Sequence, residues 1–303
     1  MPVVSATVQR HPLVTSDHPL GELRVTAPDA PVDVLRDVMA EEGYVYLPGF
    51  FDRDRVLAVR RELTGRLARL GVLAAGTDPM DGILAPEGTR PHINELYRRL
   101  VVDNPVVHDL LYGEQMMGFF KGFLGGPALH FDYTWIRATT PGHGTAAHTD
   151  IVFMGRGTPR LYTAWVPYGD IPLDLGGLAV LEHGHRHDAV RVEYGSHDVD
   201  TYCENTGEHP TTGPDPDRSL LDADPVHLRD RLGGRWLTTS YHAGDVVIFG
   251  MFTPHVGVDN ATADRLRLSS DSRYQLASED ADERWIGPDP VGHGPNAKRG
   301  MIC

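Results

Sequence analysis

LHFDYTWIRA at residues 129–138 is followed by AAHTDIVFM at residues 146–154, and a turn-forming stretch with Pro and Gly separates the two. Both runs are short and rich in aromatic, β-branched and other apolar residues, a composition that predicts β-strands. Four more runs of this kind follow: RLYTAWVPY (160–168), GLAVLEHG (177–184), RWLTTSYHAGDVVIFG (235–250) and RLRLSSDSRYQL (265–276). Many short strands without intervening helices predict a sandwich or barrel rather than a parallel doubly wound sheet.

The part of the chain before these strands has helical spacing. PVDVLRDVMAEEG, at residues 31–43, places apolar side chains on one face of a short amphipathic helix, and Gly43 follows as its stop. YVYLPGF, at residues 44–50, predicts a strand, and Asp52 is suited to cap a second helix in RDRVLAVRRELTGRLARLG. INELYRRLVVDNPVVHDLLYG, at residues 93–113, resumes the helical pattern. The front third is therefore expected to be helical with one strand.

One long polar segment, EYGSHDVDTYCENTGEHPTTGPDPDRS, separates the fourth predicted strand from the fifth. A long insertion of this kind in a compact fold is usually an active-site cover or a mobile loop. Nothing marks a linker between independent domains, so we expect one domain over residues 1–303. Its parts would be a helical N-terminal part at about 30–125, a β-rich core at about 129–276 and a lid-like insertion at about 190–235.

Charge and composition argue against several kinds of partner. The chain has 42 acidic and 28 basic residues, a formal charge of −14, which opposes attraction to phosphate backbones and anionic lipid. Neither nucleic acid nor a membrane is therefore expected as a partner. No window approaches the roughly 18 apolar residues of a membrane span, and the first residues lack the pattern of a secretion signal. A cytoplasmic protein is expected, and its oligomeric state is left open.

The two cysteines are Cys203 and Cys303. They are too few for a disulfide framework and lack the spacing of a thiolate zinc site. Reduced cysteines in a reducing compartment are the expectation.

A histidine and an aspartate stand two positions apart in AAHTDIVFM. Side chains at i and i+2 of a strand project from the same face, about 6.6 Å apart, so His148 and Asp150 could share one target. With His255, in GMFTPHVG, they have the residue types of the facial triad of non-haem Fe(II) oxygenases. Because the chain has 16 histidines, an HxD pair arises easily by chance, and a structural histidine is the simpler explanation for the pair alone.

The strand predicted at residues 265–276 has one polar and one apolar face. Arg267 and Ser269 alternate with Leu266 and Leu268, so the two pairs point in opposite directions. An ordinary half-exposed strand would leave the arginine in water. The alternative is a buried guanidinium that binds a carboxylate through two parallel hydrogen bonds.

These segments together resemble the phytanoyl-CoA dioxygenase family of Fe(II)- and 2-oxoglutarate-dependent oxygenases. The resemblance covers most of residues 32–275 and rests on four stretches: EEGYVYLPGFFDRDRVLAVRREL, HTD, AWVPYGDIPLDLGGLAVLEHGH and GDVVIFGMFTPHVGVDNATADRLRLSSDSRYQ. It implies a mainly β fold with flanking helices, the double-stranded β-helix (a cupin-like jelly roll). It also implies that His148, Asp150 and His255 are Fe(II) ligands. The iron halogenases of this fold have a small residue in place of the carboxylate, so Asp150 argues against halogenation.

The resemblance also implies a binding site for 2-oxoglutarate. Arg267 matches the family's 2-oxoglutarate arginine, and Ser269 completes an Arg-x-Ser pair. Trp165 falls where an aromatic residue flanks this cosubstrate, although a tryptophan at such a position is more often part of the core.

The chain departs from the family at one turn. The usual Pro-Gly-Ser-His reads EHGH here, so His185 matches the histidine, whereas Glu182 and His183 are unusual. These two residues either face the substrate or are solvated turn residues. Arg137 could bind substrate or pair with a surface carboxylate.

The function implied is hydroxylation of an unactivated C–H bond of a small molecule, with a natural-product intermediate as one candidate. The reaction would consume O2 and 2-oxoglutarate and release succinate and CO2. Desaturation, cyclisation and epimerisation use the same site and stay open. Two alternatives are a cupin-like metalloenzyme that does not use 2-oxoglutarate and a non-catalytic small-molecule binding protein. Residues 73–100 and 190–235 are the expected specificity loops.

Overall fold

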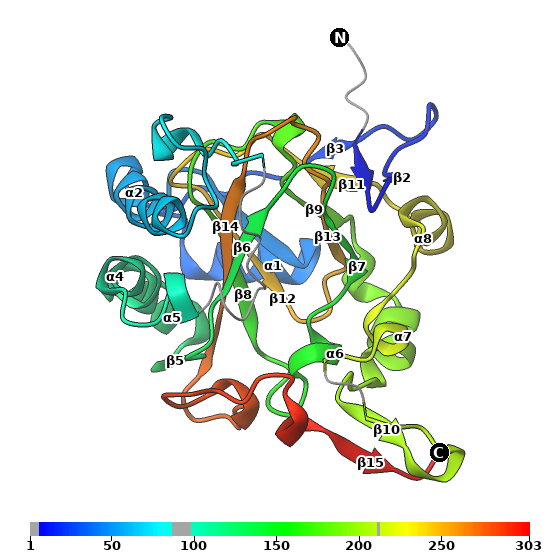
Figure 1. Ribbon diagram of the computed structural model, residues 1–303. Coiled ribbons are helices and arrows are strands. Elements are labelled where there is room, and N and C mark those ends of the chain that lie inside the picture. Colours follow the sequence, from blue (N-terminus) through cyan, green and yellow to red (C-terminus); the bar gives the residue numbers. More distant parts are fainter. Residues whose placement is uncertain (1–5, 87–97, 211–212) are drawn as a thin grey trace.

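The computed structural model describes residues 6–86, 98–210 and 213–303, and its core consists of two β-sheets (Figure 1). The larger sheet has the strand order β4 (Tyr44–Leu47), β12 (Val246–Gly250), β8 (Tyr162–Pro167), β14 (Arg267–Leu276) and β5 (Ala128–His130), and β6 (Trp135–Thr139) also pairs with β14. The smaller sheet has the order β3 (Gly21–Glu22), β11 (Trp236–Thr238), β9 (Leu178–Leu181), β13 (His255–Gly257) and β7 (Thr145–His148).

From β6 onward the chain crosses repeatedly between the two sheets, and it stays in the smaller sheet only from β9 to β11, on either side of the insertion. The strands β7, β9, β11 and β13 lie in the smaller sheet, whereas β8, β12 and β14 lie in the larger one. One apolar cluster takes side chains from both sheets, including Trp165 and Val247 from the larger and Val180 and Leu237 from the smaller. The sheets therefore face each other across a shared interior. This arrangement is the double-stranded β-helix, or jelly roll, that the sequence predicted.

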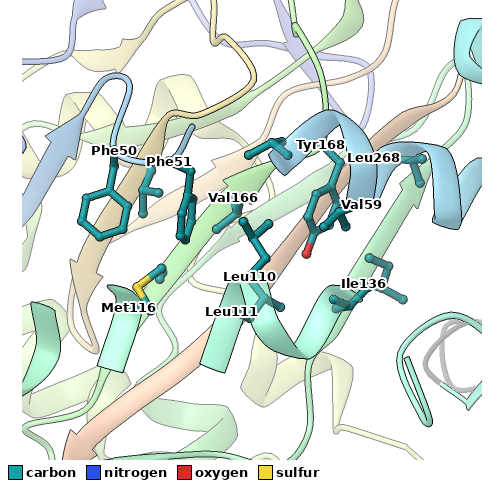
Figure 2. Close-up of a cluster of buried hydrophobic side chains, with 14 of the residues drawn as sticks. Phe50, Phe51, Val59, Leu110, Leu111, Met116, Ile136, Val166, Tyr168 and Leu268 are labelled. Carbon is teal, nitrogen blue, oxygen red and sulfur yellow. The ribbon is translucent and has the colours of Figure 1, made fainter. Parts of the chain in front are cut away.

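Helices cover the outer face of the larger sheet. They are α1 (Val32–Glu42), α2 (Arg53–Arg69), α4 (Pro105–Tyr112) and α5 (Glu114–Leu124). Figure 2 shows the apolar cluster between these helices and the sheet, where Val59 and Leu110 lie near Val166 and Leu268. The leucine face of β14 is thus covered by helices, and its polar face points to the interior between the sheets.

The predicted stop of α1 and the predicted cap of α2 are confirmed, whereas the helical stretch predicted at 93–113 is interrupted before α4, which begins at Pro105. Gly43 follows α1 with φ +80°, a conformation that glycine adopts without steric cost. The Asp52 side chain accepts a hydrogen bond from the Arg55 backbone N–H and caps α2. Of the segment predicted to be helical at 93–113, residues 93–97 lie outside the described residues.

Three predicted strands differ in the structure. LHFDYTWIRA forms two strands, β5 and β6, and RWLTTSYHAGDVVIFG also forms two, β11 and β12. In the second case the chain turns at Gly244, whose φ is +113°, and the Asp245 carboxylate accepts the His242 backbone N–H inside the turn. AAHTDIVFM leaves the sheet after His148, because Asp150 has helical backbone angles and begins the short helix α6 (Ile151–Met154).

The strand β10 (Thr201–Cys203) of the insertion and the strand β15 (Arg299–Met301) of the C-terminal segment lie side by side at the lower right of Figure 1. The insertion also contains α7 (Pro216–Ser219) and α8 (Pro225–Leu232). The strands β10 and β15 pair in parallel. A disulfide joins Cys203 to Cys303, so the expectation of reduced cysteines is wrong. The sequence separation of 100 residues concealed the pairing, because only the fold brings the two segments together.

The N-terminal residues add the short strands β1 (Thr7–Val8) and β2 (His11–Pro12), which pair with each other. Apolar side chains here, such as Leu13, pack with α8 on the outer side of the smaller sheet. Within residues 6–86, 98–210 and 213–303, no helix has the length and apolar character needed to cross a membrane.

Candidate metal centre and active-site cavity

The two histidines predicted as metal ligands lie on neighbouring strands. The strand β13 pairs antiparallel with β7, and His255 stands opposite His148, with their ring centroids 4.2 Å apart. The register shifts just after this pair, as in a β-bulge, a feature that often re-aims side chains next to active sites. Strand pairing therefore explains why a histidine far downstream in the sequence reaches the HxD pair.

Asp150 completes the cluster from the start of α6 rather than from the strand. Its Oδ1 atom lies 4.0 Å from Nε2 of His148 and 3.9 Å from Nε2 of His255. Bonds from a metal to nitrogen or oxygen are about 2 Å long, so one ion between these atoms can contact all three. The three residues are buried, and their ligand atoms all lie within 4.8 Å of one another.

Backbone carbonyls orient both imidazoles. Nδ1 of His148 lies 2.8 Å from the carbonyl oxygen of Ala146, and Nδ1 of His255 lies 3.0 Å from that of Thr253. A carbonyl only accepts, so each Nδ1 carries the proton and each Nε2 presents its lone pair to the cluster. Burial, with His255 nearby, lowers the pKa of His148 to about 3. The ring is therefore neutral at pH 7, the form that binds metals.

The other carboxylate oxygen of Asp150 is bound by protein donors. Arg273 donates from Nη2 to Oδ2 at 3.1 Å, and the Thr163 hydroxyl also donates to Oδ2. Burial alone would raise the pKa of Asp150, but Arg273, the two imidazoles and the Thr163 hydrogen bond together hold it well below its usual value. Asp150 is therefore ionised at neutral pH.

The polar face of β14 is buried in the interior between the sheets. Arg267 is 3% exposed and Ser269 is 0% exposed. Arg267 donates to the carbonyl of Gly176 and to the hydroxyl of Thr139, both at 2.8 Å. Burial, with Arg137 nearby, lowers the pKa of Arg267 to about 10, so the guanidinium stays charged at neutral pH. The half-exposed alternative for this strand is therefore wrong.

Arg137 lies beside this row. It stands opposite Ser269 on β6, and its Nε donates to the Asp271 carboxylate at 2.8 Å. Asp271 is buried, so the predicted surface carboxylate is in fact an interior one. The Arg137 side chain keeps 25% of its surface exposed, and the residue lines the cavity described next.

A cavity of about 660 Å³ contains His148 and Asp150 in its wall. Aromatic rings make up much of the remaining wall: Tyr133, Trp135, Phe153 and Trp285. The insertion contributes residues such as Pro214 and Leu220, and the C-terminal segment contributes residues 289–294. Of the predicted specificity loop at 73–100, Arg98 lines the cavity, and residues 87–97 lie outside the described residues.

Residues 39–268 match the sequence pattern of a known family, phytanoyl-CoA dioxygenase (PhyH). The chain belongs to the phytanoyl-CoA dioxygenase family. It is similar to the 1-deoxypentalenic acid 11-beta-hydroxylases of Streptomyces exfoliatus and Streptomyces arenae, each 25% identical over 86% of this chain and 87% of the relative.

Solved structures show the same fold. The carbocyclase SnoK from nogalamycin biosynthesis matches with a TM-score of 0.56 and 17% identity, over 88% of this chain and 92% of that chain. EctD from S. alaskensis matches with a TM-score of 0.55 and 16% identity, over 98% of this chain and 95% of that chain. These matches confirm the predicted fold, the double-stranded β-helix.

Family membership identifies the chain as an Fe(II)- and 2-oxoglutarate-dependent oxygenase. The cupin-like enzyme without 2-oxoglutarate and the non-catalytic binder are therefore not retained.

The interior also fits 2-oxoglutarate, the cosubstrate that phytanoyl-CoA dioxygenases use. Nε of Arg267 and Oγ of Ser269 are buried and have no hydrogen-bond partner among the described residues. An anionic carboxylate is the complement that such a pair of donors requires.

The remaining predicted residues lie elsewhere. Trp165 is buried in the cluster between the sheets, with its ring 4.6 Å from that of Tyr241. Glu182 pairs with Arg235 through two hydrogen bonds, and His183 contacts the carbonyl of Glu41. Neither Glu182 nor His183 is among the described residues that line the cavity, which fits their interpretation as turn residues.

Sequence reasoning missed several contributors to this site. Thr163 carried a signal, because it stands two positions before Trp165 on β8 and so shares its face, but its contact with Asp150 depends on the fold. Trp285 and His293 lie beyond residue 276, where the predicted core ended, and both line the cavity. Their positions depend on packing between distant segments, which strand periodicity does not report.

Proposed function

We propose that this chain hydroxylates an unactivated C–H bond of a small natural-product intermediate, and that His148, Asp150 and His255 bind the Fe(II). The observation that carries the proposal is that one carboxylate oxygen of Asp150 lies 3.9–4.0 Å from the Nε2 atoms of His148 and His255, with Asp150 and His148 in the wall of the cavity. The two relatives described above are named hydroxylases, which favours hydroxylation over cyclisation or epimerisation.

Arg267 and Ser269 would bind the far carboxylate of 2-oxoglutarate. Their buried atoms without partners support this role, and so does the charge that Arg267 keeps at neutral pH. Trp165 would form part of the apolar wall beside the cosubstrate. When bound, Fe(II) and 2-oxoglutarate together supply the O2-dependent oxidising chemistry, with succinate and CO2 as the other products. The protein orients the target bond and excludes water.

Arg137 and the aromatic wall support a substrate that is largely apolar and carries a carboxylate. The Nε atom of Arg137 is engaged by Asp271, which fixes the guanidinium, and the side chain remains partly exposed to the cavity. A guanidinium fixed in this way can present its terminal amino groups to a carboxylate. The relatives act on a carboxylic acid by name, and the present chain would act on a related carbocyclic acid.

The insertion at 190–235 would act as a lid, because its residues Pro214 and Leu220 line the cavity. It would belong to one domain that also includes the helical part at 30–125 and the core at 129–276.

A substrate screen tests this proposal. The purified Fe(II)-loaded enzyme is incubated with 2-oxoglutarate, O2 and a panel of carbocyclic acids, each paired with its methyl ester, and succinate is measured. We expect substrate-dependent succinate with one or more acids, a much lower yield with the esters, and a hydroxylated product by mass spectrometry. The variant Arg137→Gln should lower the difference between acid and ester. Equal turnover of acids and esters would contradict the role of Arg137, and a product of unchanged oxygen content would contradict hydroxylation.

A further inference from the structure

The two oxygens of the Asp150 carboxylate have different surroundings. Oδ1 faces the Nε2 atoms of His148 and His255. Oδ2 accepts hydrogen bonds from Arg273 and Thr163. The carboxylate thus has one oxygen directed at the metal position and one directed at protein donors.

We propose that Arg273 and Thr163 are positioning residues that bind Oδ2 and so leave Oδ1 as the single oxygen available to the metal. A carboxylate free to rotate can bind a cation through both oxygens and occupy two coordination positions. With Oδ2 bound, the other positions stay available for 2-oxoglutarate and O2. This inference rests on the proposed function, because it takes Asp150 as a metal ligand.

The strand register brings the two donors together. Arg273 on β14 stands directly opposite Thr163 on β8, and opposite residues of an antiparallel pair have side chains on the same face. The larger sheet therefore presents both donors to one oxygen of Asp150, which comes from α6 across the interior. Two donors from a paired sheet fix the carboxylate more firmly than one flexible side chain can.

Arg273 is itself fixed in place. It is 2% exposed, its guanidinium carbon lies 4.1 Å from the centroid of the Trp135 ring, and its Nη1 donates to the Asp271 carbonyl at 3.2 Å. A planar guanidinium stacked on an aromatic ring loses little further freedom when it donates a hydrogen bond. Trp135 and Arg273 both line the cavity, as does Asp150, so the stacked guanidinium and the proposed metal ligand share one wall.

A purely structural role is the competing explanation, because any buried carboxylate needs a countercharge. Arg273 alone cannot separate the two explanations, since it contributes both charge and orientation. Thr163 can, because its hydroxyl is neutral and supplies a directed hydrogen bond without a countercharge. Thr163→Val removes the donor at nearly constant volume, and Thr163→Ser keeps it.

The test is an anaerobic calorimetric titration of the metal-free full-length chain with Mn(II). Groups behind a metal ligand typically contribute about 10–100-fold in metal affinity. We expect Thr163→Val to bind Mn(II) at least about 10-fold more weakly than wild type, with Thr163→Ser close to wild type. Arg273→Lys keeps the charge but loses the planar fork, and it should also weaken binding. Thr64→Val, a buried threonine in α2, is the matched control and should bind like wild type.

The thermal unfolding midpoint of each metal-free variant separates orientation from stability. Lower Mn(II) affinity in Thr163→Val, with a midpoint equal to that of Thr64→Val, supports the proposal. Wild-type affinity in Thr163→Val overturns it, whatever the midpoints and whatever the affinity of Arg273→Lys. Asp150→Ala is titrated in parallel. If Asp150→Ala binds Mn(II) as tightly as wild type, the proposed metal centre itself is wrong. If Asp150→Ala loses Mn(II) binding while Thr163→Val keeps it, only the positioning role is wrong.

Discussion

Two regions of the molecule are held together in different ways: the interior around β14, and the outer wall of the cavity, which the insertion and the C-terminal segment form. In the interior, Arg267, Ser269 and Arg273 project from one face of a single strand, so their relation is set by local periodicity. Behind the part of the cavity wall that the insertion and the C-terminal segment form, Asp200 of the insertion binds Lys298 and His293 of the C-terminal segment, at 2.7 Å and 2.8 Å. The difference indicates that one strand, β14, sets the arrangement of the interior side chains. The wall formed by the insertion and the C-terminal segment depends instead on contacts between distant segments.

The largest effect is expected in the interior. Asp150→Ala should reduce both Mn(II) binding and succinate formation to background, because it removes the only anionic group of the proposed ligand set. Calorimetry and a succinate assay measure the two effects. Asp37→Ala, an exposed position on α1, is the matched control and should behave like wild type. Wild-type turnover in Asp150→Ala would remove this residue from the ligands.

The 2-oxoglutarate anchor is the next test. Arg267→Ala removes one partner of a buried charged pair, a change that costs about 2–5 kcal/mol. The affinity of the Mn(II)-loaded enzyme for 2-oxoglutarate should therefore fall at least about 30-fold, measured by calorimetry. Arg235→Ala, which breaks an exposed pair with Glu182, is the control and should leave this affinity unchanged. An undiminished affinity in Arg267→Ala would place the anchor elsewhere.

A third test addresses the outer wall. Asp200 is 0% exposed, and Arg284, Lys298 and His293 all donate to its carboxylate. Burial alone would raise the pKa of Asp200, but these partners hold it well below its usual value, so Asp200→Asn removes a charge that is present at neutral pH. We expect a loss of about 3–5 kcal/mol in the free energy of unfolding, measured with denaturant.

If the two regions are independent, Asp200→Asn should leave Mn(II) affinity unchanged. Hydrogen exchange should then increase in β10 and β15 and stay constant in β14. Increased exchange in β14 would show that the interior depends on the outer wall.

The smallest effect is expected from the disulfide between Cys203 and Cys303. Cys303→Ser should cost about 2–4 kcal/mol in the free energy of unfolding, because the cross-link restricts the unfolded chain. Mn(II) affinity should not change. Alkylation under native conditions should detect no free thiol in the wild type, and two reactive thiols there would contradict the pairing.

The same comparison explains how far the sequence predicts the site. The alternation of Arg267 and Ser269 with Leu266 and Leu268 predicted both faces of β14, because a strand fixes side-chain direction with a period of two residues. Membership of the family and the jelly roll followed from the order of motifs. The contact of Thr163 with Asp150 joins β8 of the larger sheet to the start of α6, so it depends on how distant segments pack, which no single segment encodes. The disulfide and the Asp200 cluster depend on contacts across the insertion and were missed for the same reason.

The most direct test of the central claim is anaerobic addition of Fe(II) and then 2-oxoglutarate to the metal-free enzyme, followed by visible absorption. If His148, Asp150 and His255 bind the iron and Arg267 anchors the cosubstrate beside it, a weak metal-to-ligand charge-transfer band will appear and saturate with 2-oxoglutarate. The band will be absent in Asp150→Ala. No band in the wild type, or the same band in Asp150→Ala, would contradict the account.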